Sequence, residues 1–272
     1  MKPLEYWKPE SFEISSFQFK LDERKNKTYK TSGSDNTGLC DYTYNELGFR
    51  GDSVKKEGFK VMSLGCSNTE GVGVNYIETW PYQFTNFIPN SVNMNFGTGG
   101  RSNDFISRCL LTYYDIIKPD LVLIMYPSPL RREIYTKDCG IEPFMPTHIW
   151  GYLEKTEEGR KIQLLKTELQ NNNEDFINWY KNHLLIKYFL ETKGCNWLWN
   201  GSSDIPKEYK EFNRFDGDFS TYPNFIDYGV DNAHPGPKHN YHYTIKLFEY
   251  IKTNFRNYLP QDLNEIGKQS LI

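Results

Sequence analysis

Alanine is almost absent from this sequence, since Ala233 is the single alanine among 272 residues. Alanine is the best helix former, so no folding argument favours its loss. The residues that occur at high frequency instead are Asn, Lys, Ile and Tyr. We attribute this pattern to an AT-rich genome, such as that of a phage or an AT-rich microbe. A GC-balanced source genome would contradict the hypothesis.

Cysteine is scarce as well, and no Cys-x-x-Cys pair occurs among the five residues Cys40, Cys66, Cys109, Cys139 and Cys195. An odd, scattered set suits reduced thiols in an intracellular compartment better than a disulfide framework or a zinc site. We therefore expect a cytoplasmic protein with no metal and no other cofactor. The sequons at Asn26 and Asn200 are then expected to be chance matches.

The sequence has no apolar run near the ~20 residues that a membrane-spanning helix requires. Its first residues, Met1 to Trp7, carry an early acidic residue and no apolar segment like that of a secretory signal peptide. A net charge of -3 and a pI near 6.0 lack the positive excess of proteins that coat nucleic acids. We expect neither nucleic acid nor a membrane as a partner, and nothing predicts the oligomeric state.

Length and composition indicate a soluble globular chain, with 38% hydrophobic, 25% charged and 16% aromatic residues. A chain of this length can bury a large core and needs no stabilisation by disulfides or metal ions. Residues 1–55 are polar and predict a loosely structured N-terminal arm. We expect the main domain at residues 56–260, with an insertion at about 130–172, and a C-terminal tail at 261–272.

Short apolar strands alternate with helical patterns along the main domain. Strands are expected at 59–64, 91–96, 121–126 and 196–200, and helices at 77–88, 105–117, 159–170, 175–192 and from 235–237 onward. Residues 121–126 are continuously apolar, as a central parallel strand should be. The alternation predicts a three-layer α/β/α sandwich with a mostly parallel central sheet. In such folds ligands bind beyond the carboxyl ends of the strands.

Three turns follow expected strands. The first, Gly65 to Gly73, contains Ser67, whose hydroxyl would be exposed where backbone N–H groups can face a developing negative charge. The second, Asn95 to Asp104, is rich in glycine, which lets the backbone approach a ligand. Taken singly, each segment is also compatible with an ordinary turn. In the second, Ser102 or Asn103 would be the N-cap of the next helix.

The third turn runs from Asp231 to Pro237 and places Asp231 three residues before His234, which is followed by Pro235 and Pro237. A carboxylate at this spacing can orient an imidazole through its Nδ1–H. Nucleophilic catalysis by serine needs such a base, because a free hydroxyl is a poor nucleophile. A lone histidine in such a turn is also compatible with a structural role.

Together these turns resemble the SGNH hydrolases, also called the GDSL esterase/lipase family. Gly65-Cys66-Ser67, followed by Thr69 and Gly71, is similar to the family's Gly-Asp-Ser block, and Asn95 to Gly100 to its second block. Residues 118–124 look like the approach to the third block. Asp231-x-x-His234-Pro235-Gly236 resembles the fifth block, and residues 44–51 a lead-in of many bacterial and phage members. The likeness covers roughly 43–255 and implies a flavodoxin-like α/β/α fold.

The resemblance implies a role for each matching residue. Ser67 would be the nucleophile, His234 the general base, and Asp231 the carboxylate that holds the imidazole in its productive tautomer. The backbone N–H groups of Ser67 and Gly100 would supply two of the three donors of an oxyanion hole.

Two departures from the family pattern stand out. Cys66 replaces the family's Asp, and Cys66 itself stays an alternative nucleophile, although free cysteine is usually a small buried hydrophobe. The third block lacks its Asn, because residues 126–132 read Tyr-Pro-Ser-Pro-Leu-Arg-Arg. Loss of one oxyanion donor costs roughly 10²–10³ in rate. Ser128, Asn103 or Arg131 could substitute for the missing donor, and Arg131 could also bind substrate.

Other candidate sites stay open as weaker alternatives. His234, His239 and His242 could suit zinc, but prolines intervene and the last two fall on an expected helix. Asp227 could replace Asp231 as the orienting carboxylate. A further set of aromatic residues could line a sugar-binding cleft or belong to the core: Trp197, Trp199, Tyr222 and Phe225.

The expected function is hydrolysis of a carboxylic ester through a serine acyl-enzyme. By family analogy, the substrate is a small-molecule or carbohydrate ester with a small acyl group such as acetyl. Two alternatives remain. One is acyl transfer to a sugar or peptide hydroxyl on the same residues. The other is a catalytically inactive binding or assembly module with the same fold.

Overall fold

The computed structural model describes residues 25–32, 39–135, 141–144, 172–201, 205, 213–215, 219, 225–261 and 263. The strands are β1 (Thr28–Ser32), β2 (Leu39–Thr43), β3 (Phe59–Gly65), β4 (Ser91–Asn95), β5 (Leu121–Tyr126), β6 (Arg132–Tyr135), β7 (Ile141–Phe144) and β8 (Asn196–Gly201). The helices are α3 (Ser67–Glu70), α4 (Trp80–Asn86), α5 (Asn103–Ile117), α7 (Asn172–Lys193) and α8 (Pro237–Asn254), with 3-10 turns η2 (Tyr76–Glu78) and η5 (Arg256–Tyr258).

The central sheet has the strand order β4-β3-β5-β8, and every neighbouring pair in it is parallel. The first of these strands in the chain, β3, therefore lies between the second and the third. The connections leave β3 toward opposite edges of the sheet, so the carboxyl ends of β3 and β5 form a topological switch point. Ligand sites of open α/β sheets lie at such points.

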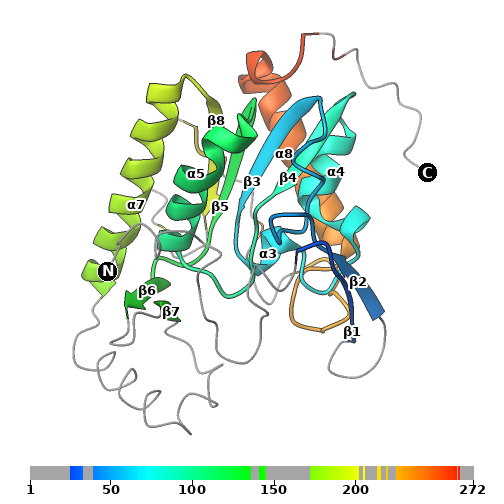
Figure 1. Ribbon diagram of the computed structural model, residues 1–272, viewed down its shortest axis with the longest axis horizontal. Coiled ribbons are helices and arrows are strands. Elements are labelled where there is room, and N and C mark those ends of the chain that lie inside the picture. Colours follow the sequence, from blue (N-terminus) through cyan, green and yellow to red (C-terminus); the bar gives the residue numbers. More distant parts are fainter. Residues whose placement is uncertain are drawn as a thin grey trace, which may run out of the picture.

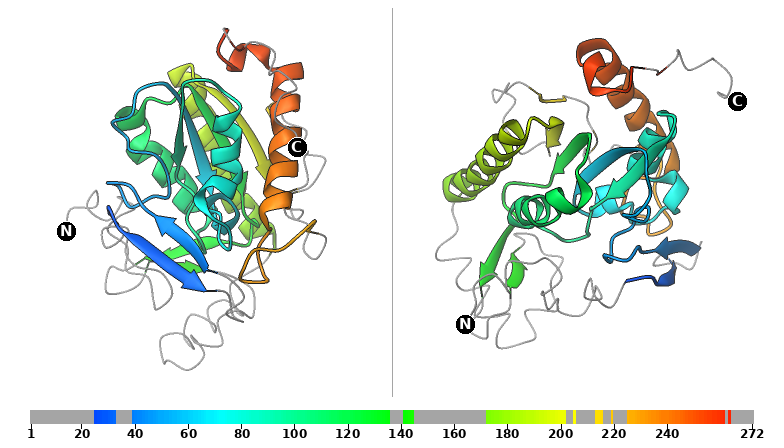
Figure 2. Two further views of the ribbon diagram at one scale, coloured as in Figure 1. Left: turned by 90° about the vertical axis from the view of Figure 1, so that its right-hand side faces the viewer. Right: turned by 45° about the horizontal axis from the view of Figure 1, so that its top comes forward.

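Helices cover both faces of this sheet (Figures 1 and 2). Successive side chains of a strand point to opposite faces. One face buries Met62, Leu64, Val122, Ile124 and Tyr126 against α5 and α7. The other buries Val61, Leu121, Leu123, Met125 and Leu198 against α4 and α8. The expected three-layer α/β/α sandwich with a mostly parallel sheet is confirmed.

The expected strands at 59–64, 91–96, 121–126 and 196–200 are confirmed, as are the helices at 105–117 and 175–192. Ser102 is the N-cap of α5, because its side chain accepts a hydrogen bond from the N–H of Phe105 at 3.3 Å. The prediction of one continuous helix at 77–88 was wrong. Thr79 has an extended backbone and caps α4, so it separates that helix from η2.

The expectation of a loosely structured arm was wrong for the described part of residues 25–55. β1 and β2 pair as an antiparallel hairpin. Cys40, Tyr42 and Tyr44 are buried and pack with Val230, which lies in the turn that contains Asp231. Alternation of polar and apolar residues here is weak, and the residues that bury this segment, such as Val230 and Glu70, are distant in the sequence. The domain boundaries stay predictions.

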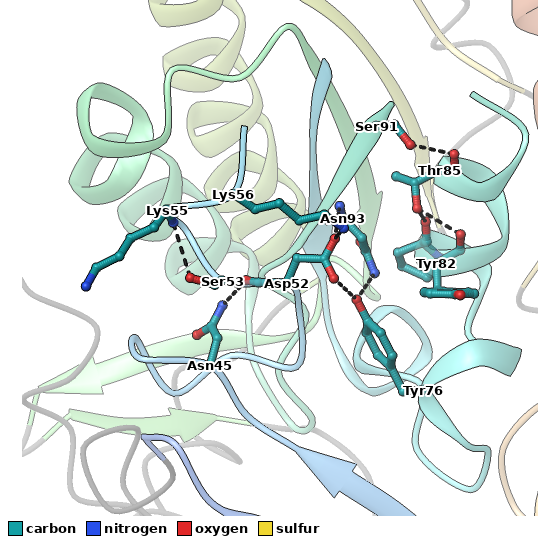
Figure 3. A network of polar contacts seen from close by, with 11 residues as sticks. Asn45, Asp52, Ser53, Lys55, Lys56, Tyr76, Tyr82, Thr85, Ser91 and Asn93 are labelled. Carbon is teal, nitrogen blue, oxygen red and sulfur yellow. Dashed lines mark hydrogen bonds and ion pairs between the residues drawn. The ribbon is translucent and has the colours of Figure 1, made fainter. Parts of the chain in front are cut away.

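Residues 51–56 cover the free edge of β4 (Figure 3). The N–H of Asp52 donates to the carbonyl of Asn93 at 2.8 Å, and the Asp52 carboxylate accepts from the Asn93 N–H at 3.0 Å. The same carboxylate accepts from Tyr76 Oη at 3.0 Å and pairs with Lys56 at 2.9 Å. Burial and the Asp52 charge raise the pKa of Tyr76. The contacts protect an edge that could otherwise pair with another chain.

Part of the expected insertion is described. β6 and β7 form an antiparallel hairpin, and Arg108 of α5 makes a buried double contact with Glu133 of β6, at 2.6 Å and 3.1 Å. Burial raises the pKa of Glu133, although the Arg108 charge opposes this. The helical stretch expected at 159–170 lies outside the described residues. Within the described ranges, no helix has both the length and the apolar composition to cross a membrane.

Candidate active site

The first and second of the predicted turns meet at the carboxyl ends of β3 and β4, beside β5. Gly65, the last residue of β3, pairs with Met125 of β5. The carbonyl of Gly65 also accepts a hydrogen bond from the N–H of Thr98, beyond β4, at 3.2 Å. The first and second turns are thus directly joined at the switch point.

Ser67 begins α3, the single helical turn that follows β3. The residue is partly exposed, whereas Cys66 beside it is buried, and Ser67 Oγ lies 4.0 Å from Cys66 Sγ. Accessibility therefore favours the serine over the cysteine as a nucleophile. Within the described residues, no hydrogen bond engages the backbone N–H of Ser67 or of Gly100. Both groups remain available to a ligand.

The glycine-rich turn after β4 lies against α3. The Asn95 side chain donates to the carbonyl of Thr69 at 2.8 Å and accepts from the N–H of Gly97 at 2.8 Å. A Cβ on Gly97 would lie 2.3 Å from the backbone nitrogen of Glu70, so only glycine allows this close approach. The second turn is therefore fixed directly on the helix that begins with Ser67.

Asp231 and His234 are in direct contact. Asp231 Oδ2 lies 2.5 Å from His234 Nδ1, and Oδ1 accepts from the N–H groups of His234 and Ala233, both at 3.1 Å. A hydrogen bond to the carboxylate places a proton on Nδ1 and leaves Nε2 as the basic nitrogen of a neutral ring. Both side chains are about three quarters buried, with 27% of His234 and 24% of Asp231 exposed.

The pKa of Asp231 is low. Partial burial raises it, but the hydrogen bond and charge of His234, with the two backbone N–H groups, outweigh burial and lower the pKa to about 2. The carboxylate thus stays ionised across the range in which the imidazole works as a base. An ionised partner stabilises the imidazolium that forms when His234 takes a proton.

The other acidic candidate, Asp227, has a different role. Its two carboxylate oxygens accept from the backbone N–H groups of Lys238 at 3.0 Å and His239 at 2.8 Å, at the start of α8. Asp227 therefore caps a helix and does not contact His234. The structure pairs the histidine with Asp231.

The turn that contains Asp231 and His234 docks on the chain just beyond Ser67. The N–H of Val230 donates to the carbonyl of Gly73 at 2.8 Å. Gly73 has a φ of 84°, and a Cβ there would lie 2.7 Å from Asp231 Oδ1. No direct hydrogen bond joins Ser67 Oγ to His234 in the described structure. Catalytic hydrogen bonds are often long in proteins without substrate.

The three candidates for the missing oxyanion donor differ in their partners. Asn103 Nδ2 donates to the carbonyls of Ser128 at 3.1 Å and Arg131 at 3.5 Å, which disfavours its use toward a substrate. Ser128 Oγ accepts from the N–H of Leu130 at 3.3 Å, so its own proton stays free to donate. Arg131 Nη1 is buried with no hydrogen-bond partner in the described structure.

Two buried charged residues near the site were not singled out by sequence reasoning. Arg50 is 0% exposed and donates to the carbonyls of Asp41, Glu70, Gly71 and Val74. Glu70 is 2% exposed and accepts from Tyr44 and from Gly99. No local signal in the sequence could have found them, because their burial depends on partners in distant segments, such as Tyr44 for Glu70.

The remaining candidates differ in where the structure places them. His239 is buried, with Nδ1 accepting from the N–H of Ile226 and Nε2 donating to the carbonyl of Phe219, whereas His242 is exposed. The described residues contain no group of three or more His, Cys, Asp or Glu side chains that could hold a metal. Trp197 and Trp199 lie in the core with α7. Tyr222 lies outside the described residues.

No protein-family model matches the chain, and no curated protein matches it. A solved structure of a gut microbial diltiazem-metabolizing enzyme is 13% identical with a TM-score of 0.31, over 73% of this chain and 34% of that one. A protein from Desulfitobacterium hafniense DCB-2, whose name places it in the lipolytic G-D-S-L family, is 12% identical with a TM-score of 0.31, over 70% and 98%.

A third structure, from Bacteroides fragilis NCTC 9343, is named as an acylhydrolase and is 16% identical with a TM-score of 0.30, over 74% of this chain and 88% of that one. The present chain spans about a third of the first of these three proteins, 34% of its length. At TM-scores this low, the likeness supports no inference about activity.

Proposed function

We propose that the protein is a serine hydrolase that cleaves a carboxylic ester through an acyl-enzyme. Ser67 is the nucleophile, His234 the general base and Asp231 the residue that orients the imidazole. The observation that carries this proposal is the 2.5 Å contact between Asp231 and His234 Nδ1, in a turn docked on Gly73 just beyond Ser67. The motif resemblance of these same turns to the SGNH hydrolases supports it further.

The reaction proceeds in two halves. Ser67 Oγ attacks the ester carbonyl carbon while its proton passes to Nε2 of His234. The tetrahedral intermediate collapses, the C–O bond to the alcohol breaks, and the alcohol leaves with the proton from His234. Water then attacks the acyl-enzyme, giving its proton to His234. Collapse of the second intermediate releases the acid and returns the proton to Ser67.

The backbone N–H groups of Ser67 and Gly100 face the developing oxyanion in this mechanism. Their lack of hydrogen-bond partners in the described structure supports that role, because an oxyanion hole needs donors that are not already engaged. Arg131 or Ser128 is the better candidate for the third donor, since the Asn103 amide is bound to two carbonyls. The substrate class we favour is a small acyl ester such as an acetylated carbohydrate.

Two alternatives use the same fold. Acyl transfer to a sugar or peptide hydroxyl would appear as acyl groups on an added acceptor. A binding or assembly module without catalysis is favoured by two observations, the altered third block and the lack of a hydrogen bond between Ser67 and His234.

The first experiment is labelling of the purified protein with a fluorophosphonate, followed by mass spectrometry to locate the adduct. An adduct on Ser67 supports the proposal, because only an activated serine beside a working oxyanion site reacts readily. Ser67→Ala and His234→Ala should each abolish labelling and ester turnover while the protein stays folded by circular dichroism. No adduct on folded protein, beside a labelled control hydrolase, would favour the binding module.

A further inference from the structure

The Glu70 carboxylate joins three parts of the site. Glu70 ends α3, three residues after Ser67, and its side chain is buried. One carboxylate oxygen accepts from the hydroxyl of Tyr44 at 2.9 Å, and the other accepts from the backbone N–H of Gly99 at 2.6 Å. The nucleophile helix, the lead-in segment and the glycine-rich turn are therefore joined through this one side chain.

The bond to Gly99 matters because of the turn in which Gly99 lies. The N–H of Arg101 donates to the carbonyl of Thr98 at 3.4 Å, which closes a turn with Gly99 and Gly100 at its centre. Gly100 has a φ of 71°, as the third residue of a type II turn requires. Neither central residue has a Cβ, so the peptide between them can flip at little steric cost.

A flip of that peptide would reverse the direction of the Gly100 N–H. The hydrogen bond to Glu70 holds the N–H of Gly99 against α3. This bond fixes one side of the Gly99–Gly100 peptide. Charge-assisted hydrogen bonds of this kind are about twice as strong as neutral ones. Glu70 is therefore well placed to keep the Gly100 donor in one orientation.

A buried negative charge near an oxyanion site would oppose the reaction unless it were balanced. Arg50 places a positive charge in the same region, since its guanidinium is buried and donates to the backbone carbonyl of Glu70 at 3.2 Å. Both charges act on the same neighbour, because Arg50 lowers and Glu70 raises the pKa of Tyr42, whose net rise comes mainly from burial. A buried positive charge and a buried negative charge therefore lie in the same region of the site.

We propose that Glu70 is a positioning residue that holds the Gly99–Gly100 peptide so that the N–H of Gly100 faces the oxyanion. The inference rests on the proposed ester hydrolysis and adds to it a residue outside the catalytic set. Glu70 acts through Gly99 and touches no reacting atom.

The test compares Glu70→Ala and Glu70→Gln with a matched control, Glu78→Gln. Glu78 also accepts a backbone hydrogen bond through its carboxylate, from Asn75 at 2.8 Å, but lies in η2, away from the glycine-rich turn. The kinetic probe is p-nitrophenyl acetate. The probe for the oxyanion is phenylboronic acid, to whose boron Ser67 Oγ adds while the hydroxyl proton passes to His234.

We expect Glu70→Ala to lower kcat about 10²-fold with KM nearly unchanged, because the variant loses stabilisation of the transition state and not of the bound substrate. The inhibition constant of phenylboronic acid should rise in parallel. Glu70→Gln keeps an acceptor for Gly99 and should lose less than about tenfold. Glu78→Gln should match the wild type. Amide hydrogen exchange of the peptide that contains residues 97–101 should rise in Glu70→Ala and not in Glu78→Gln.

Three results would overturn the inference. A rise in KM with kcat unchanged would show a loss of substrate binding only. Equal losses in Glu70→Gln and Glu70→Ala, or unchanged exchange at residues 97–101, would show that the bond to Gly99 does not hold the turn. A wild-type protein with no turnover and no fluorophosphonate adduct would overturn the proposed function itself, and any catalytic role for Glu70 with it.

Discussion

The carbonyl of Gly73 accepts the backbone hydrogen bond of Val230 at 2.8 Å, and this contact joins two turns that lie far apart in the sequence. Gly73 follows α3, whose first residue is Ser67, and Val230 directly precedes Asp231. The contact therefore sets the distance between the predicted nucleophile and the predicted acid–base pair. It also makes Gly73 a sensitive position.

Gly73→Ala should impair the site through two separate effects. A φ of 84° is the left-handed region, where a side chain costs about 1–2 kcal/mol. The new Cβ would also lie 2.7 Å from Asp231 Oδ1, so the carboxylate must move. We expect a loss of about 10²-fold in kcat, as for other displacements of catalytic groups, measured on p-nitrophenyl acetate.

Gly194→Ala is the matched control for that variant. Gly194 has a φ of 64° but no atom within 4 Å of an added Cβ, so it tests backbone strain alone. It should lower the melting temperature and leave kcat unchanged. Equal kcat values in the two variants would show that the contact between Gly73 and Asp231 has no catalytic importance.

Asp231→Asn and Asp227→Asn should separate the two acidic residues of this region. Asn at 231 cannot hold the imidazole with a proton on Nδ1, and the equivalent change in a serine protease triad lowers kcat about 10⁴-fold. Asn at 227 leaves one of two N–H groups of α8 without its acceptor, at about 1 kcal/mol. We therefore expect Asp231→Asn to lose mainly rate and Asp227→Asn to lose mainly unfolding free energy, when both quantities are measured on both variants. A comparable rate loss in both would contradict the assignment.

The low pKa of Asp231 predicts a specific loss of stability in acid. A carboxylate whose pKa falls on folding stabilises the native state above its ordinary pKa of 3.8 and loses that contribution as the pH falls toward about 2. The difference in unfolding free energy between the wild type and Asp231→Asn should therefore shrink between roughly pH 4 and pH 2. A difference that grows in this range would contradict the direction of the shift.

Local patterns predicted much of this fold. The continuously apolar run at 121–126 predicted a central buried strand, and the 3.6-residue period of 105–117 ended at Pro119. Asp231 and His234 could be paired because they are three residues apart in one turn. Each of these inferences needed only a short stretch of chain.

What the sequence did not reveal depends on contacts between distant segments. Arg50 and Glu70 are charged and would ordinarily be solvated, yet both are buried. Arg50 donates to the carbonyl of Glu70, and Glu70 accepts from Tyr44, so these partners lie about 20 residues away or more. The β1–β2 hairpin was missed for the same reason, since the apolar contact of its buried residues is Val230. No local pattern encodes such partners.

The third oxyanion donor is the point at which this chain departs most from the family it resembles. Arg131 Nη1 is buried without a hydrogen-bond partner in the described structure, and an unsatisfied buried donor is costly. If Arg131 is the third donor, the oxyanion of the bound substrate satisfies this group. We therefore expect Arg131→Met, which keeps the aliphatic stem, to lower kcat on p-nitrophenyl acetate about 10²-fold with little change in KM.

Ser128→Ala and Asn103→Ala test the competing candidates in the same assay. Ser128→Ala should change kcat little if Arg131 is the donor, and a large loss there with a normal rate in Arg131→Met would transfer the role to the Ser128 hydroxyl. Asn103→Ala should act mainly on stability, because the carbonyls of Ser128 and Arg131 lose the side-chain donor that they share, at about 1 kcal/mol. Loss of rate in that folded variant, with melting temperature unchanged, would instead assign the oxyanion contact to Asn103.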